Sequence, residues 1–168
     1  MVCNSKTEKD MKQTTLCYIE QNGKYLMLHR VKKQNDASHD KWIGVGGKCE
    51  MNESPEECML REVKEETGFD IVEWRYRGIV TFISDHWPAE YMHLFTASKW
   101  TGEMIECDEG DLEWIDKKDL FNLTLWKGDK IFLNLLEDEA YPFFSLKVVY
   151  QEDELISAKL NNVPLSIE

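Results

Sequence analysis

The stretch between positions 50 and 66 carries the residues best suited to do chemistry in this sequence. Seven of its 17 residues are glutamate, and three of them, Glu62, Glu65 and Glu66, are spaced i, i+3 and i+4. On an α-helix that spacing places the three side chains on one face. Carboxylates this close repel one another, and a divalent cation would turn the repulsion into a binding site. Oxygen ligands favour Mg²⁺, Ca²⁺ or Mn²⁺ over Zn²⁺, and a half-open cluster suits Mg²⁺.

The alternative is a solvated helix face, which is what most glutamate-rich helices present. The surrounding residues favour a site, because they are arranged around the triplet. The pair Gly46-Gly47 allows the backbone to approach a ligand or a metal closely. Arg61 can pair with Glu53, and Met59 and Val63 supply an apolar contact that can hold the helix against a sheet.

The helix that must carry these glutamates has clear start and stop signals. Ser54 can cap it, Pro55 suits its first turn, and Glu57 completes a capping box three residues after the serine. Gly68 ends the pattern. We therefore predict a helix over residues 54–67.

The remaining elements alternate between strand and helix without a regular βαβ repeat. Residues 21–23 read Gln-Asn-Gly between two apolar runs, which predicts a hairpin turn. The pattern predicts an α/β fold, a mixed sheet with helices packed on its faces. The expected strands are residues 16–19, 25–28, 42–47, 71–83, 91–100, 112–115, 143–150 and 154–160, with a polar loop at 32–40 and a second helix at 127–136.

Length and charge restrict the class of protein. A chain of 168 residues suits one domain, expected at residues 11–168, after a flexible N-terminal tail at residues 1–10. The net charge of −12 argues against binding to DNA, RNA or an anionic membrane. No apolar run reaches the length of a membrane span or a signal peptide, and the five scattered cysteines indicate neither zinc nor disulfides. We expect a cytoplasmic protein, either a monomer or a homodimer.

The spacing around the glutamates resembles a known family signature. From Gly47 it runs five residues to Glu53, seven to Arg61-Glu62-Val63, one to Glu65-Glu66, and one to Gly68-Phe69. This is similar to the complete Nudix box. The resemblance implies a Nudix α/β/α sandwich around a mixed β-sheet. It also implies an enzyme that hydrolyses nucleoside diphosphates linked to another moiety, by attack of water on phosphorus.

The resemblance also implies roles for individual residues. Glu62, Glu65 and Glu66 would bind the metal together with the carbonyl of Gly46, and Glu65 would deprotonate or orient the attacking water. Arg61 and Glu53 belong to the same catalytic constellation. The implied cofactor is Mg²⁺, with Mn²⁺ as a substitute. Metal ions in such a site lower the pKa of bound water and neutralise developing charge.

The resemblance extends beyond the box to MutT-type enzymes, which convert oxidised purine triphosphates such as 8-oxo-dGTP to the monophosphate and pyrophosphate. The segments that carry it read KWIGVGGK, CDEGDLEW, LWKGD and FFSLKVVY.

That comparison implies further site residues, each of which also has an ordinary structural explanation. Glu109 would be an additional metal ligand, although it could belong to a plain acidic loop. Trp126 would stack on the purine and Asp129 would bond to its edge, although a tryptophan before a helix is often a core residue. Arg30 and Lys48 would contact the substrate, and Arg30 could equally end a strand in solvent.

Two positions depart from the pattern of some animal relatives. Ile43 stands where they have an asparagine that reads the oxidised base, and Gly128-Asp129 stands where they have two successive aspartates. A strict preference for 8-oxo-dGTP therefore does not follow from the sequence. ADP-ribose, a dinucleoside polyphosphate and an mRNA cap are alternative substrates. A Nudix domain that binds a nucleotide without cleaving it is a third hypothesis, weakened by the presence of every box glutamate.

Overall fold

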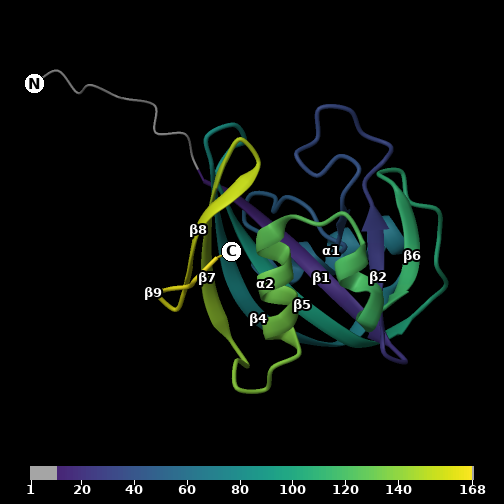
Figure 1. Ribbon diagram of the computed structural model, residues 1–168. Coiled ribbons are helices and arrows are strands. Elements are labelled where there is room, and N and C mark those ends of the chain that lie inside the picture. The colour runs from purple at the N-terminus through teal and green to yellow at the C-terminus, as the bar shows by residue number, and fades with distance from the viewer. Residues whose placement is uncertain (1–10, 168) are drawn as a thin grey trace, which may run out of the picture.

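The computed structural model describes residues 11–167, and within them nine strands form one mixed sheet (Figure 1). The order is β3-β2-β1-β5-β4-β7-β8-β9, and β6 pairs with β2. β1 runs parallel to β5 and β4 parallel to β7, whereas the other described pairs are antiparallel. The strands are β1 (Lys12–Gln21), β2 (Lys24–His29), β3 (Trp42–Ile43), β4 (Asp70–Ser84), β5 (Glu90–Thr101), β6 (Asp111–Asp116), β7 (Phe144–Gln151), β8 (Glu154–Leu160) and β9 (Val163–Pro164).

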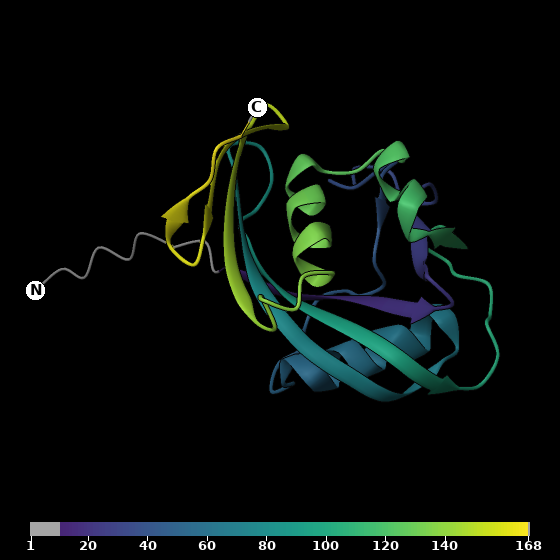
Figure 2. The same ribbon diagram turned by 60° about the horizontal axis from the view of Figure 1, so that its bottom comes forward.

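The two α-helices cover opposite faces of the sheet, as the two views show (Figures 1 and 2). They are α1 (Pro55–Thr67) and α2 (Lys127–Leu136), and a short 3₁₀ helix, η1 (Lys117–Asn122), precedes α2. Alternate side chains of β1 enter the two cores. Tyr18 packs on the side of α2 and Ile19 on the side of α1. The predicted α/β/α sandwich around a mixed sheet is confirmed.

Most of the predicted helices and strands are confirmed, including the hairpin turn between β1 and β2. Asn22 and Gly23 both adopt positive φ angles, of 51° and 73°, which a two-residue turn of this hand requires. The predicted strand over residues 42–47 was wrong in length. Only Trp42 and Ile43 pair with β2, after which the chain crosses to β1 through an isolated bridge between Val45 and Cys17.

Two short elements were not predicted, η1 and the two-residue strand β9. The expected flexible tail at residues 1–10 lies outside the described residues. Within residues 11–167, no helix is both long enough and apolar enough to cross a membrane.

The ends of α1 fix the position of the glutamate cluster. The Ser54 hydroxyl accepts a hydrogen bond from the Glu57 backbone amide at 3.0 Å, and the Glu57 carboxylate accepts one from the Ser54 amide at 3.1 Å. Gly68 ends the helix with a φ of 83°, a conformation that strains any residue with a side chain. Met59 and Val63 are fully buried, so the inner face of α1 is held firmly on the sheet.

Replacing the cap should loosen the helix that carries the cluster. We expect Ser54→Ala to lower the free energy of unfolding by about 1 kcal/mol, because the Glu57 amide loses its acceptor. Urea denaturation followed by circular dichroism measures this. Ser157→Ala, at an exposed position on β8, is the matched control. Equal stability of the two variants would show that the cap is unimportant.

Candidate active site

A glycine pair lies between β1 and α1 and brings the two elements together. The Gly47 carbonyl accepts a hydrogen bond from the Thr15 amide at 2.9 Å. A Cβ atom on Gly46 would lie 1.8 Å from the Thr15 carbonyl oxygen, and one on Gly47 would lie 2.5 Å from the carboxyl carbon of Glu62. The two glycines therefore allow the backbone to run directly against the carboxylates of the helix.

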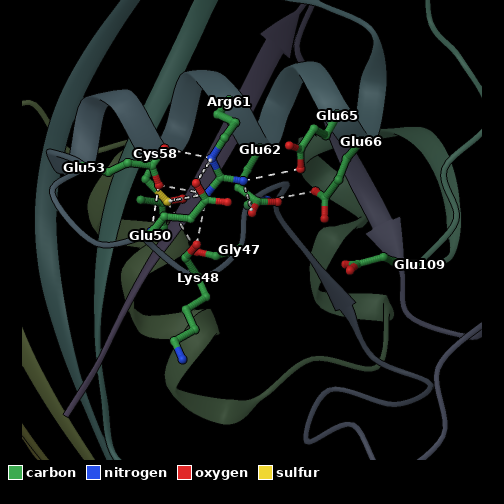
Figure 3. A network of polar contacts seen from close by, with 12 residues as sticks. Gly47, Lys48, Glu50, Glu53, Cys58, Arg61, Glu62, Glu65, Glu66 and Glu109 are labelled. Atoms are coloured by element: carbon green, nitrogen blue, oxygen red, sulfur yellow. Dashed lines mark hydrogen bonds and ion pairs between the residues drawn. The ribbon is translucent and has the colours of Figure 1, made fainter. Parts of the chain in front are cut away.

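Arg61 connects most of the acidic side chains around it (Figure 3). Its guanidinium donates to both Glu53 oxygens, at 2.7 and 2.9 Å, to Glu62 at 2.8 Å and to Glu65 at 3.4 Å. A further bond of 3.1 Å to the Lys48 carbonyl ties it to the glycine segment. The predicted pairing of Arg61 with Glu53 is confirmed. Hydrogen bonding from Arg61 holds the pKa of Glu53 at about 2, so this carboxyl is ionised throughout the physiological range.

Glu66 is the buried member of the triplet. One carboxyl oxygen accepts a hydrogen bond from the Gly46 amide at 3.1 Å, whereas the other, Oε1, has no partner among the described residues. Burial, followed by the neighbouring carboxylates of Glu109 and Glu62, raises the pKa of Glu66 to about 9. A buried carboxyl with a free oxygen, facing other carboxylates, is placed as a cation ligand would be.

Glu109 lies in the loop before β6 and approaches the cluster from there (Figure 3). Two cations hold its carboxylate. Arg30 Nη1 lies 2.5 Å from one Glu109 oxygen and Lys33 Nζ lies 2.7 Å from the other. Arg30 also binds Asp36 at 2.8 Å. Although burial alone would raise the pKa of Glu109, the hydrogen bond from Lys33 and the charge of Arg30 lower it.

The carboxylates do not form a ready-made cage for a cation. Within the described part of the chain, no three Asp, Glu, His or Cys side chains converge closely enough to hold a metal. The ion pairs explain this, since Arg61 draws Glu62 and Glu65 to one side while Arg30 and Lys33 hold Glu109. The donor set nevertheless fits a hard divalent cation, because it consists of carboxylate oxygens and includes the unpartnered Glu66 Oε1.

A cavity of about 690 Å³ joins this cluster to an apolar region. Its charged lining includes Glu62, Glu109, Arg30 and Lys48, together with the two glycines. Its apolar lining consists chiefly of Ile43, Phe82, Trp87, Met92 and Trp126, which belong to one core cluster or pack against it, and the carboxyls of Glu90 and Asp129 also line the cavity. The predicted metal and substrate residues thus line one cavity, except Glu65 and Glu66, which stand on the helix beside it.

Trp126 serves both as a core residue and as part of the cavity wall. Its side chain is buried against Phe82 and Tyr150, and its indole N–H donates to the Ser38 hydroxyl at 3.1 Å. The Lys41 ammonium lies 4.4 Å from the centre of the indole ring. A base stacked on that face would have to displace the ammonium. The sequence did not indicate this contact between Lys41 and Trp126.

Asp129 lies in the first turn of α2 and is buried. Burial, followed by the negative charge of Glu90, raises the pKa of Asp129 to about 8, while the Lys41 ammonium opposes the rise. The carboxyl is therefore largely neutral at pH 7 and can donate a hydrogen bond as well as accept one.

Lys33, Ser38, Lys41 and Glu90 were not identified from the sequence. Three of them belong to the polar segment between β2 and β3, and the fourth begins β5. The fold brings Lys33, Ser38 and Glu90 to the wall of the cavity and places Lys41 over the ring of Trp126. Trp87 and Pro88, between β4 and β5, also line the cavity.

The NUDIX domain family model matches residues 11–136, which is 126 of the 168 residues. The chain belongs to the Nudix family. Nudix enzymes are hydrolases of phosphoanhydride bonds in nucleotides and generally use divalent metal ions. In this Nudix hydrolase the residues of the box lie on α1 and on the glycine segment before it.

Similar proteins of known family align with most of the sequence of this Nudix hydrolase. The uncharacterized Nudix hydrolase YvcI of Bacillus subtilis is 31% identical over 156 residues, which cover 90% of this chain and 95% of the relative. The oxidized purine nucleoside triphosphate hydrolase of Danio rerio is 29% identical over 126 residues, which cover 74% of this chain and 79% of the relative. The solved structure of a MutT protein from Bacillus halodurans matches with a TM-score of 0.79 at 28% identity, over 92% of this chain and 100% of that chain.

The buried Asp129 carboxyl should make stability depend on pH. Because its pKa is raised from 3.8 to about 8 on folding, its contribution to stability is fully present below pH 3.8 and is lost as the pH rises through 8. Asp129→Asn does not titrate, so its melting temperature should exceed that of the wild type by a margin that grows between pH 4 and pH 8. Thermal unfolding across this range tests it, with the exposed Asp119→Asn as the control for net charge. A margin that is constant with pH would contradict the assignment.

Proposed function

We propose that this Nudix hydrolase cleaves oxidised purine nucleoside triphosphates, such as 8-oxo-dGTP, to the monophosphate and pyrophosphate. The observation that carries the proposal is the lining of the cavity, which is divided between charged side chains such as Glu62 and Glu109 and the aromatic Trp126 with Asp129. A nucleotide has the same division between a charged phosphate chain and an aromatic base. The named activities of the Danio rerio relative and of the 8-oxo-dGTP diphosphatase of Proteus vulgaris, 33% identical over 67 residues, support it.

Glu62, Glu65, Glu66, Glu109 and the Gly46 carbonyl would hold Mg²⁺, or Mn²⁺ in its place. The metal would polarise the phosphate oxygens and lower the pKa of a bound water. Glu66 offers its unpartnered oxygen, and the glycine backbone lies directly beside it.

Glu65 is proposed to take the proton from the attacking water. Its side chain is 59% exposed, and its contact with Arg61 is long, at 3.4 Å. Glu62, by contrast, is bound to Arg61 at 2.8 Å and only 15% exposed. Glu65 is therefore the member of the triplet best able to reach water. Arg61 and Glu53 act as positioning residues, since their double hydrogen bond fixes the helix face against the loop.

Arg30, Lys33 and Lys48 would neutralise the phosphate chain. Arg30 and Lys33 are bound to Glu109 in this structure, and Lys48 is an exposed residue that lines the cavity. These side chains supply positive charge to the phosphate end of a protein whose net charge is −12.

Other Nudix substrates remain as alternatives, namely ADP-ribose and dinucleoside polyphosphates. NAD-capped RNA hydrolases also resemble the chain, but over 77 residues that cover 26% of one such enzyme. The acidic character of the chain weighs against an RNA cap.

A substrate panel tests the proposal. We expect turnover of 8-oxo-dGTP that requires Mg²⁺ and exceeds turnover of dGTP, ATP, ADP-ribose and diadenosine tetraphosphate by tenfold or more in kcat/KM, about 1.4 kcal/mol. Release of pyrophosphate and monophosphate is measured with and without Mg²⁺. A preference for ADP-ribose or diadenosine tetraphosphate would show that this compound, and not 8-oxo-dGTP, is the substrate. Binding without turnover would indicate a non-catalytic domain.

Two substitutions on α1 separate proton transfer from metal binding. Glu65→Gln should lower kcat by roughly 10²–10⁴-fold, because a general base is lost. Glu66→Gln should weaken Mn²⁺ binding, measured by calorimetry, by at least tenfold without lowering the melting temperature, since an amide is easier to bury. Glu113→Gln, exposed on β6, is the control. Unchanged kcat in the first variant and unchanged Mn²⁺ affinity in the second would contradict these roles.

A further inference from the structure

Glu90 is a partly buried carboxyl that none of the roles described so far accounts for. It is the first residue of β5 and lines the cavity together with Asp129 and Trp126. Within residues 11–167, neither the Glu90 nor the Asp129 side chain forms a hydrogen bond or a salt bridge. Both carboxyls nevertheless lie close enough for the charge of Glu90 to act on Asp129.

Such an arrangement is costly unless something uses it. Removing a carboxyl from water without a partner is unfavourable, and placing a second carboxyl nearby adds repulsion. Buried polar groups without partners are uncommon in folded proteins and call for an explanation. Here Asp129 is buried and Glu90 is partly buried, and both line a cavity whose lining also includes the apolar side chains of Phe82 and Met92. The cavity is where a partner for both could bind.

The backbone of Glu90 is held firmly. It pairs with Lys12 of β1 and with Phe82 of β4, so it lies between two neighbouring strands. Asp129 is fixed separately, in the first turn of α2. The two carboxyls therefore reach the cavity from different elements, each of which is anchored independently. A rigid pair of this kind can select a ligand by the positions of its hydrogen-bonding groups.

We propose that Glu90 is a specificity-determining residue, which binds the hydrogen-bonding edge of the substrate base together with Asp129. This rests on the proposed function, since it assigns the apolar end of the cavity to the base. Trp126 then forms the wall beside the base. The phosphate chain extends toward the glutamates of α1.

The chemistry of two carboxyls favours particular bases. Carboxyl oxygens accept hydrogen bonds, so the pair favours a base with several N–H donors. Guanine offers its ring N1–H and its exocyclic amine, whereas adenine offers only its amine. Oxidation at C8 converts N7 from an acceptor to an N–H donor, which gives 8-oxoguanine one more donor than guanine. The expected order of affinity is 8-oxo-dGMP, then dGMP, then dAMP.

The charges around the pair are compatible with this role. Burial raises the pKa of Glu90, with Asp36 adding to the rise and Lys12 opposing it. Burial also raises the pKa of Asp129, and Lys41 opposes that rise. A carboxyl kept in its neutral form can also donate to a carbonyl oxygen of a guanine-type base.

Binding of monophosphates without metal tests the proposal independently of turnover. Calorimetry would compare 8-oxo-dGMP, dGMP, dAMP and the base-free deoxyribose 5-phosphate. We expect Glu90→Gln to weaken 8-oxo-dGMP binding at least tenfold, or 1.4 kcal/mol, and to leave deoxyribose 5-phosphate binding unchanged. In turnover, KM should rise while kcat stays the same. Glu90→Ala is the second variant, and the exposed Glu103→Gln is the control.

Several outcomes would overturn the proposal. For Glu90→Gln, these are an affinity for 8-oxo-dGMP within twofold of the wild type, or an equal loss of affinity for deoxyribose 5-phosphate. For the wild type, they are tighter binding of dAMP than of dGMP, or no binding of any monophosphate. A lower melting temperature in both Glu90 variants would assign the carboxyl to folding instead. If no triphosphate is hydrolysed but Glu90→Gln still weakens the binding of 8-oxo-dGMP, the proposed function fails and the role of Glu90 in base binding stands.

Discussion

The carboxylates of Glu53, Glu62 and Glu65 all contact one guanidinium, that of Arg61. Without it, the negative side chains of α1 and of the loop before it would repel one another across a few ångströms. The same guanidinium also binds the backbone at Lys48, so it joins the helix to the segment that follows the glycine pair. The glycine pair lies beside a carboxylate, that of Glu62, whose charge this guanidinium balances. Both the shape and the chemistry of the site therefore depend on Arg61.

The glutamate triplet shows how one helix face can place similar side chains in different surroundings. Glu66 turns inward and is bound by the Gly46 amide, while Glu65 turns outward to water. The difference follows from helix geometry, since successive positions are rotated by about 100°. The helix therefore presents one anchored carboxyl and one that is exposed to water. Under the proposed function the two would have separate roles, because a metal must be held while a proton is moved.

Local signals predicted much of the fold. Ser54, Glu57 and Gly68 define the ends of α1 through backbone hydrogen bonds that depend only on nearby residues. The positive φ angles of Asn22 and Gly23 determine the first hairpin in the same way. β9 was missed because two residues, one of them a proline, carry no periodic pattern. The shortened β3 was missed because its end is set by contact with β1, a neighbour distant in sequence.

The box residues of the site could be predicted for the same reason, since their spacing reflects one helix. Lys33 and Glu90 could not, because each reaches the cavity only after the sheet has formed. The Lys41 ammonium over Trp126 is a further example. Nothing in the order of residues shows that a lysine preceding β3 will lie on an indole that precedes α2.

The lining of the cavity comes from different parts of the chain. Gly46, Gly47, Lys48 and Glu62 belong to α1 and the segment before it, whereas Phe82, Glu90, Met92, Trp126 and Asp129 belong to β4, β5 and the start of α2. Residues of one group can be substituted without changing any residue of the other group. Substrate choice can therefore drift while the cleavage chemistry is kept. A gene duplicate of such an enzyme could acquire a new nucleotide substrate through a handful of changes at the start of β5 and α2.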